Sequence, residues 1–402
     1  MLDTRNVELY VGLMSGTSMD AVDAVIVELA PDSCKLVAAH SHEIEPALKA
    51  EILSLCSPGG NELFRMKTLD RKLGQLFAEA TGVLLDLSRV RREHIVAIGS
   101  HGQTIRHSPD SSPGFSVQIG DPHTIAEQTG ILTVADFRQR DIAAGGQGAP
   151  LLPLFHEAYL LKQVDSSCVI NIGGMANISA LINNGKQLVG YDTGPGNVLL
   201  DYWINQHKKV GYDENGNWAA SGEVIPQLLA SFLSDDYFDS LPPKSTGRER
   251  FNERWLRNHI ALSDKSVSFE KSGQANKTRP QDIQCTLAEL TARSITDSAL
   301  QHAGASTLIL CGGGAKNDYL MERIKAYAKE KKQTAEVKYS DDFGLPADWV
   351  EAMGFAWFAQ RTLNSCHSST PGVTGASHDC ILGSIHAGKN GLKPLVFSPN
   401  QE

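Results

Sequence analysis

The sequence predicts an α/β protein built from two related halves. Three observations predict this class: short strand-like runs alternate with helical patterns, the strand order begins a second time near the middle of the chain, and a glycine-rich turn stands at the corresponding place in each half. A chain of 402 residues is long enough for two domains that each bury a core.

The first half opens with a predicted three-stranded meander. Its strands are separated by turn-forming residues and cover Glu8–Gly12, Ala21–Leu29 and Lys35–Ile44. Apolar residues at helical spacing then predict a helix over Glu62–Leu87. A helix is also expected from Pro122, among strands at Ile95–Ser100, Val117–Ile119 and Ile131–Ala135.

The second half repeats this order. Three strands are expected at Cys168–Ile172, Ile178–Ile182 and Leu188–Tyr191, followed by a helix from Asn197. Later elements are a strand at Thr307–Cys311 and helices near Asp282–His302, Asp318–Lys329 and Trp349–Leu363. The apolar stretch Pro150–Leu161 separates the halves, so we expect domains at 1–150 and 151–402. The polar segment Ser234–Gln281 is interpreted as a surface excursion or a small helical insert.

Composition narrows the classes of partner. The net charge of −9 argues against nucleic acid or an anionic membrane as the main partner, although a local group of arginines can still bind an anionic substrate. The sequence has neither a signal-peptide pattern nor an apolar run long enough to span a bilayer. The seven scattered cysteines form no CxxC pair, as is common in a reducing compartment. We therefore expect a cytoplasmic protein.

The first glycine-rich turn lies between the first two predicted strands. Glycine lets backbone N–H groups approach a phosphate, and hydroxyl groups add donors. The candidate ATP-binding or phosphate-binding residues here are Gly16, Thr17, Ser18, Met19, Asp20, Ala21, Val22 and Asp23. Asp20 is also a candidate for holding hydrated Mg²⁺. The turn lacks the GK[ST] ending of a Walker A loop, and an ordinary hairpin turn is the alternative.

Two turns of the second half form a corresponding motif. The sequence NIGGMAN (171–177) supplies the phosphate-binding candidates Gly173, Gly174 and Asn177, and YDTGPGN (191–197) supplies Gly194 and Gly196. Asp192 stands at the carboxyl end of a strand, beside a glycine turn and a helix start. A carboxylate there is suited to act as a general base near phosphate. A capping or turn aspartate is the alternative.

A third glycine cluster follows the strand Thr307–Cys311. Gly312, Gly313 and Gly314 leave side-chain-free backbone against which a nucleobase or ribose can lie. Tight packing of a strand against a helix would also require glycine here.

The motifs together resemble the superfamily of hexokinase, actin and the heat-shock chaperone ATPases. A narrower resemblance rests on seven strings in order: GLMSGTSMDAVD, IGSHGQTIRH, QIGDPHTIAEQTG, VADFRQRDIAAGGQGAPLLP, NIGGMANIS, YDTGPGN and CGGGAKN. They resemble the anhydro-N-acetylmuramic acid kinase family. The resemblance implies two duplicated actin-like ATPase (ribonuclease H-like) domains with an interdomain cleft for ATP. Ala21 departs from the family, in which we expect glycine.

A dense polar group lies between the nucleotide motifs. Amide, imidazole and carboxylate groups near strand ends suit the hydroxyl and N-acetyl groups of a sugar, and an arginine can bind a carboxylate through two hydrogen bonds. Solvated loops and helix caps are the alternative. The candidate substrate-binding residues are His101, Gln103, Gln118, Asp136, Arg138 and Arg140, with one of the two arginines on a lactyl carboxylate. The resemblance adds Glu351, which we expect to reach the sugar from the second domain.

The resemblance also implies the reaction. Asp192 would activate water to open the 1,6-anhydro ring of 1,6-anhydro-N-acetylmuramic acid, and the freed 6-oxygen would take the γ-phosphoryl group of ATP with Mg²⁺. This reaction belongs to peptidoglycan recycling and amino-sugar catabolism, and the resemblance suggests a homodimer. Three alternatives stay open: a kinase for another sugar or polyol, a nucleotide-dependent binding or chaperone-like protein, and a silent relative.

Overall fold

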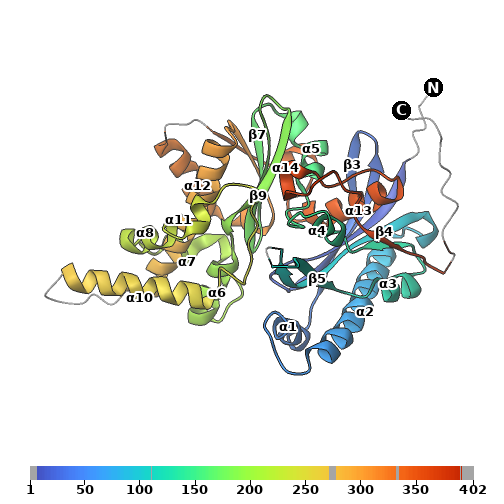
Figure 1. Cartoon of the computed structure of the whole chain (residues 1–402), viewed down its shortest axis with the longest axis horizontal. Coiled ribbons are helices and arrows are strands. Elements are labelled where there is room, and N and C mark those ends of the chain that lie inside the picture. Colours follow the sequence, from blue (N-terminus) through green and yellow to red (C-terminus); the bar gives the residue numbers. More distant parts are fainter. Residues whose placement is uncertain (1–6, 110, 271–277, 332–334, 390, 392–402) are drawn as a thin grey trace. The chain divides into compact units, whose positions relative to one another are not determined.

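The computed structural model describes residues 7–109, 111–270, 278–331, 335–389 and 391. Contacts within the chain divide it into two compact units (Figure 1). Unit 1 combines residues 1–155 with residues 349–402, and unit 2 consists of residues 156–348. Each unit contains one β-sheet with helices packed against it, so the predicted α/β class is confirmed.

The sheet of unit 1 has the strand order β12-β6-β4-β1-β2-β3, and β5 pairs with β4 beside this path. The first three strands form an antiparallel meander, whereas β1, β4 and β6 run parallel. Their bounds are β1 Glu8–Ser15, β2 Ala21–Ala30, β3 Ser33–Glu43, β4 Ile95–Ser108, β5 Phe115–Ile119, β6 Thr133–Ala135 and β12 Ser384–His386.

Helices lie on both faces of this sheet. The long helix α2 (Glu62–Ser88) buries Leu73 and Phe77 in a core shared with Val11 and Leu13 of β1. Side chains alternate along a strand, so Gly12 faces the opposite side. The remaining helices of unit 1 are α1 Pro46–Leu53, α3 Pro122–Thr129, α4 Gln139–Ala143, α13 Val350–Leu363 and α14 Pro371–Thr374, and α5 Pro153–Tyr159 lies at the boundary between the units.

Helix α13 packs against the face of the first sheet opposite α2. A Cβ atom at Gly12 would lie 1.9 Å from the carbonyl oxygen of Ala352, and a Cβ at Gly99 would lie 1.9 Å from that of Phe355. These glycines therefore allow the helix backbone to approach the sheet directly. The predicted domains differ here from the observed units: the boundary near residue 150 lies close to the observed one, but residues 349–402 group with unit 1.

The sheet of unit 2 repeats the arrangement of unit 1. Its order is β11-β10-β7-β8-β9, which matches β6-β4-β1-β2-β3 strand for strand. Again the first three strands form an antiparallel meander, and β7, β10 and β11 run parallel. The bounds are β7 Ser167–Ile172, β8 Met175–Ile182, β9 Gln187–Pro195, β10 Thr307–Cys311 and β11 Glu336–Tyr339. The duplication expected from the sequence is present in the topology.

Two groups of helices complete unit 2 (Figure 1). Helices α11 and α12 pack on the second sheet, where Ile295 and Ile324 join Ile170 and Leu310 in one core. A second core joins α6, α8, α10 and α11. The helices are α6 Val198–Lys208, α7 Asn217–Ala220, α8 Pro226–Leu233, α9 Asp236–Asp239, α10 Glu253–Glu270, α11 Pro280–Asp297 and α12 Asp318–Glu330, and a π-helical turn, Ser298–His302, extends α11.

The predicted strands and helices are present, with most ends displaced by a few residues and with β4 extending eight residues beyond its predicted end. The sequence did not predict the short strands β11 and β12 or the helices α1, α4, α7, α8 and α14. The segment 234–281 contains α9 and α10, although residues 271–277 lie outside the described part. None of the helices among the described residues is long and apolar enough to cross a lipid bilayer.

Candidate active site

The first glycine-rich turn joins β1 to β2 in unit 1. The turn closes with a hydrogen bond from the Met19 N–H to the Gly16 carbonyl oxygen (3.2 Å), and Met19 is buried with a positive φ of 55°. The Ser15 hydroxyl donates to Gln103 Oε1 (2.7 Å) and connects the turn to β4. Gln103, a predicted sugar ligand, is buried here and also fixes the first glycine-rich turn.

The acidic residues of this turn differ in their surroundings. Asp20 is largely exposed and forms an ion pair with Lys49 of α1, whereas Asp23 accepts a hydrogen bond from the Ser41 hydroxyl (2.9 Å). Ala21 begins β2 and pairs with Glu43 of β3. An exposed carboxylate beside a glycine-rich turn fits the needs of hydrated Mg²⁺, which takes only one or two protein carboxylates in addition to phosphate oxygens. Within the described part of the chain, no group of three or more His, Cys, Asp or Glu side chains could hold a metal ion by itself.

The buried His101 within β4 pairs with the partly buried Arg138, which lies between β6 and α4. Arg138 donates from Nη2 to His101 Nε2 (2.8 Å) and from Nη1 to the carbonyl oxygen of Gly148 (2.6 Å). On the other side of the ring, His101 Nδ1 lies 2.9 Å from the Gly102 carbonyl oxygen. Burial lowers the pKa of His101 to about 3, and the positive charge of Arg138 acts in the same direction with a smaller effect. The imidazole is therefore neutral, donates from Nδ1 and accepts at Nε2.

Asp141 holds the loop that follows Arg138. Its carboxylate is fully buried and accepts from the Gly148 N–H (2.7 Å) and from the hydroxyls of Thr374 (2.6 Å) and Ser369. A Cβ at Gly146 would lie 2.2 Å from Asp141 Oδ2, so this glycine allows the loop to fold around the carboxylate. The GGQG string (145–148) thus has a structural role, because it folds around the buried carboxylate of Asp141.

The other predicted sugar ligands of unit 1 occupy different positions. Gln118 of β5 donates to Ser116 Oγ (2.7 Å) and Thr104 Oγ1 (3.0 Å). Asp136 directly follows β6 with a φ of 59°, and its carboxylate lies 3.9 Å from His386 Nε2. Arg140 is exposed on α4. Glu351 stands in the first turn of α13 and therefore belongs to unit 1. The sequence had predicted it in the second domain.

Backbone hydrogen bonds bring the two glycine-rich turns of unit 2 together. The N–H groups of Asn197 and Val198 donate to the carbonyl oxygens of Gly173 (2.9 Å) and Gly174 (3.1 Å), and the Gly196 N–H also donates to Gly174 (2.9 Å). A Cβ at Gly196 would lie 2.4 Å from the Gly173 carbonyl oxygen. Only glycine therefore allows the turn before α6 to contact the β7–β8 hairpin.

The third glycine cluster lies against the same hairpin. Gly312 has a φ of 80°, and a Cβ there would lie 2.3 Å from Asn171 Oδ1. A Cβ at Gly314 would lie 2.3 Å from the Ile172 side chain and 3.0 Å from Asn197 Nδ2. The parallel pairing of β10 with β7 places the Gly312–Gly314 turn and the NIGGMAN turn at the carboxyl ends of neighbouring strands. The YDTGPGN motif lies at the end of β9, which pairs with the other strand of the hairpin, β8. Gly313 has open space around it, so its backbone is the most accessible of the three.

Asp192 lies near the end of β9, opposite Asn177 of β8, at a bulge in the strand pairing. Its side chain is buried, and Oδ2 accepts a hydrogen bond from the Thr246 N–H (2.9 Å). Its own N–H donates to the Lys244 carbonyl oxygen (3.2 Å), and its carbonyl oxygen accepts from the Tyr237 hydroxyl (2.7 Å). Asp192 is therefore fixed in the sheet beside the glycine-rich turns.

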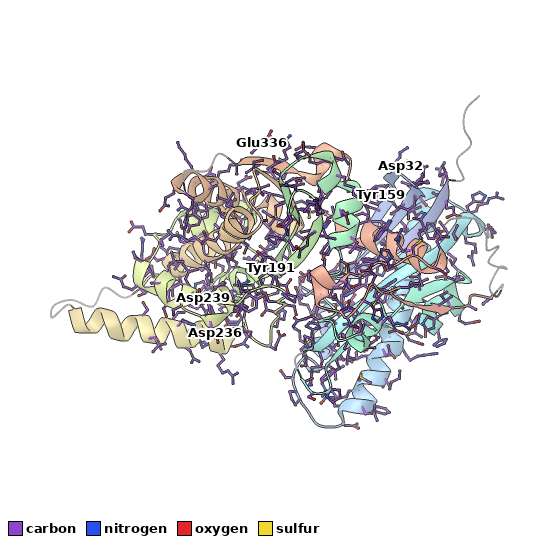
Figure 2. All side chains as sticks on the ribbon, turned by 45° about the horizontal axis from the view of Figure 1, so that its top comes forward. Asp32, Tyr159, Tyr191, Asp236, Asp239 and Glu336 are labelled. Carbon is purple, nitrogen blue, oxygen red and sulfur yellow. The ribbon has the colours of Figure 1, made fainter. Side chains whose placement is uncertain are left out.

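Sequence reasoning missed the residues that contact Asp192 from the 234–281 segment. Tyr237, Lys244 and Thr246 were assigned to a surface excursion because that segment is polar and proline-containing. The pair Pro242-Pro243 followed by the hydroxyl-rich KSTG string was the available signal. Figure 2 labels Tyr191 of β9 together with Asp236 and Asp239 of α9 in this part of unit 2.

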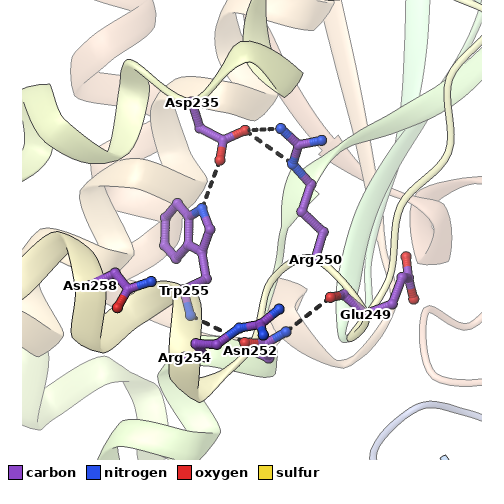
Figure 3. Close-up of a pocket in the computed structure, with 7 residues that line it drawn as sticks. All are labelled: Asp235, Glu249, Arg250, Asn252, Arg254, Trp255 and Asn258. Atoms are coloured by element: carbon purple, nitrogen blue, oxygen red, sulfur yellow. Dashed lines mark hydrogen bonds and ion pairs between the residues drawn. The ribbon is translucent and has the colours of Figure 1, made fainter. Parts of the chain in front are cut away.

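The same segment lines a pocket of about 400 Å³ (Figure 3). Figure 3 shows one carboxylate oxygen of Asp235 facing the guanidinium of Arg250 and the other facing the indole nitrogen of Trp255. Arg250 Nε donates to the first oxygen (3.0 Å) and Trp255 Nε1 donates to the second (2.8 Å). The lining residues are Asp235, Glu249, Arg250, Asn252, Arg254, Trp255 and Asn258. None of the predicted site residues lines this pocket.

The fold and these motifs define a class: duplicated α/β proteins with glycine-rich turns suited to phosphate, and with an aspartate beside those of the second unit. A sequence profile of the anhydro-N-acetylmuramic acid kinase family matches residues 8–388. The anhydro-N-acetylmuramic acid kinase of Shewanella oneidensis is 44% identical over 96% of this chain and all of that protein. That of Coxiella burnetii is 45% identical over 95% of this chain and 98% of that protein. The chain belongs to the anhydro-N-acetylmuramic acid kinase family.

Solved structures with a similar fold are more distant. A ROK family glucokinase from Streptomyces griseus, in complex with glucose and AMPPNP, is 11% identical with a TM-score of 0.39 over 88% of this chain and 99% of that chain. The family assignment rests on the sequence matches.

Proposed function

We propose that the protein uses ATP to convert 1,6-anhydro-N-acetylmuramic acid and water to N-acetylmuramic acid 6-phosphate, in the recycling of peptidoglycan. The observation that carries this proposal is the arrangement in unit 2: the buried Asp192 lies beside two glycine-rich turns joined by backbone hydrogen bonds, with the Gly312–Gly314 turn against the same hairpin. Membership in the kinase family supports the choice of ATP and of this sugar.

The reaction forms and breaks two bonds in sequence. Asp192 accepts a proton from a water molecule whose oxygen bonds to the anomeric carbon, as the bond from that carbon to the bridging 6-oxygen breaks. The 6-oxygen then bonds to the γ-phosphorus, and the bond from phosphorus to ADP breaks. The leaving 6-oxygen is captured by phosphate, so no separate acid is needed to protonate it.

The glycine-rich turns supply charge stabilisation for phosphoryl transfer. Backbone N–H groups of the Gly16–Asp20 turn and of the Gly173–Gly174 hairpin bind phosphate oxygens without reorganising, because both turns are already closed by hydrogen bonds. Mg²⁺, held through Asp20 and water, would neutralise charge on the phosphates when bound. Asp20 is exposed enough to exchange its ion pair with Lys49 for this role.

The polar residues of unit 1 bind the sugar. His101 is held neutral and in one tautomer by Arg138, which suits a hydrogen bond to a neutral ligand group or a role in shaping the site. The guanidinium of Arg138 donates to His101 and to the carbonyl oxygen of Gly148. We propose that Arg138 or Arg140 binds the lactyl carboxylate through its guanidinium, with Gln118, Asp136 and Glu351 near the sugar.

The substitution Asp192→Asn tests the proposal. We expect loss of turnover, because the amide cannot accept the proton of water, with ATP affinity unchanged in calorimetric titration. Asp165→Asn, at an exposed position before β7, is the matched control and should keep wild-type turnover. Retained activity in Asp192→Asn would exclude the assigned base.

We also propose a cellular compartment and an oligomeric state for the protein. Its substrates, ATP and a sugar, are small molecules that we propose are used in the cytoplasm. The homodimer implied by the family resemblance is tested by light scattering coupled to size exclusion, in which a monomeric mass would exclude it.

A further inference from the structure

The segment 235–246 passes directly against the backbone and side chain of Asp192. Three hydrogen bonds connect them: Thr246 N–H to Asp192 Oδ2 (2.9 Å), Asp192 N–H to the Lys244 carbonyl oxygen (3.2 Å), and the Tyr237 hydroxyl to the Asp192 carbonyl oxygen (2.7 Å). Asp192 lies on the edge strand β9 of the second sheet. The segment thus satisfies backbone groups that an edge strand would otherwise leave unpaired.

Tyr237 is the centre of this arrangement. Its ring is buried, and two cations lie over it, with Lys244 Nζ 4.6 Å and the Arg250 guanidinium carbon 5.4 Å from the ring centre. Its carbonyl oxygen accepts a hydrogen bond from Lys244 Nζ (2.9 Å). Asp235 caps the short helix α9 at the Tyr237 N–H (3.0 Å) and binds Arg250. The ring position, and with it the hydroxyl bound to Asp192, is therefore fixed from several sides.

The ammonium group of Lys244 interacts both with the ring of Tyr237 and with the carboxylate of Asp192. Burial lowers the pKa of Lys244, whereas the carboxylates of Asp239 and Asp192 act in the opposite direction. The ammonium group lies 5.8 Å from the ring centre of Tyr191, the residue before Asp192. A half-buried cation beside a carboxylate favours the ionised form of that carboxylate.

We propose that Tyr237 and Lys244 are positioning residues for Asp192, with the segment 235–246 holding the carboxylate in place and Lys244 favouring its charged form. This inference rests on the proposed role of Asp192 as the base. The tyrosine fixes the backbone of Asp192, the Thr246 N–H fixes one carboxylate oxygen, and the lysine holds the segment against the tyrosine. The segment interpreted from sequence as a surface excursion is thereby part of the catalytic unit.

Other charged or titratable groups act on the same cluster. These groups are Asp239 on α9, Glu249 and Arg250 in the loop before α10, and Tyr191 on β9. Asp239 attracts Lys244, and Arg250 is itself paired with Asp235 and Asp236. Lys244 is coupled to Asp192, so its removal should change the pH dependence of the reaction.

Three variants of the full-length enzyme test the inference. In Tyr237→Phe the ring and its cation contacts stay but the hydroxyl is lost, so we expect kcat to fall about tenfold with KM for ATP unchanged. In Lys244→Met the acidic limb of the pH profile of kcat/KM should move to higher pH by about one unit. Lys244→Arg keeps the charge and should restore the limb.

Tyr212→Phe and Lys186→Met are the matched controls, because both side chains are exposed in the same unit. A purely structural role for Lys244 would lower activity equally at all pH values, and that result overturns its part of the inference. An unchanged kcat in Tyr237→Phe overturns the proposed positioning role of the Tyr237 hydroxyl. If Asp192→Asn is inactive while both positioning tests fail, the assignment of Asp192 as the base stands and only this inference is wrong. If Asp192→Asn is active, the base assignment and the inference that rests on it are both wrong.

Discussion

Replacing Gly196 by alanine should force apart the two proposed phosphate-binding turns of unit 2, because the added Cβ has no room between them. The added Cβ would lie 2.4 Å from the Gly173 carbonyl oxygen and 3.2 Å from the Ala176 N. The two turns must separate by at least about 0.6 Å to restore a tolerable contact of about 3.0 Å, and overpacking of this kind costs about 2 kcal/mol. The separation also strains the hydrogen bonds from Gly196 and Asn197 to the hairpin.

Two measurements follow from this separation. Because displacements of about 1 Å can cost about a hundredfold in rate, we expect kcat/KM for ATP to fall at least about tenfold in Gly196→Ala. The midpoint of thermal unfolding should fall by about 4–8 °C for a loss of about 2 kcal/mol in a unit of this size. Gly211→Ala is the control, since a Cβ there meets nothing within 4 Å. Equal kinetics and equal midpoints in the two variants would refute the reasoning.

Three further predictions concern charged and titratable groups. Burial alone would raise the pKa of Glu289, but the ion pairs with Arg323 (2.6 Å) and Arg293 (2.7 Å) hold that pKa below its usual value. The ionised carboxylate therefore stabilises the folded protein above about pH 4.5, and this stabilisation is lost as the pH falls through the folded-state pKa. Glu289→Gln should therefore lower the free energy of unfolding by about 3 kcal/mol at pH 7 and by less below pH 4 in urea titrations, and a pH-independent loss would contradict this. His101, with its pKa lowered to about 3, should show no titration between pH 5 and 8 by NMR of the imidazole, whereas a midpoint near 6.5 would exclude the buried neutral pair. Arg138→Ala should raise KM for the sugar at least about tenfold without changing KM for ATP, and an unchanged sugar KM would assign the carboxylate to Arg140.

Much of the fold could be predicted because its signals are local. Alternating and helical patterns set the strands and helices, and the repeated order of strands indicated the duplication that the topology of the two sheets shows. The packing of α13 was not predictable from its own apolar pattern, which does not say which sheet the helix covers. The available signal was Gly12 and Gly99, two glycines inside strands, where a helix backbone approaches closely.

The glycine-rich turns of the candidate site were found by sequence because glycine and aspartate at strand ends carry a specific chemistry. The partners of Asp192 were not found, because Tyr237 and Thr246 lie 45 and 54 residues away along the chain. Contacts at that separation follow from tertiary packing, and neither composition nor periodicity records them. For the same reason the sequence could not show that Arg138 holds His101.

The mass of the product formed from ATP, Mg²⁺ and 1,6-anhydro-N-acetylmuramic acid tests the central claim most directly. The account predicts that the sugar gains one phosphate and one water, with the oxygen of ¹⁸O-labelled water on the anomeric carbon. A product that gains phosphate alone would contradict the role of Asp192 as a water-activating base, and an unchanged sugar would contradict the proposed substrate.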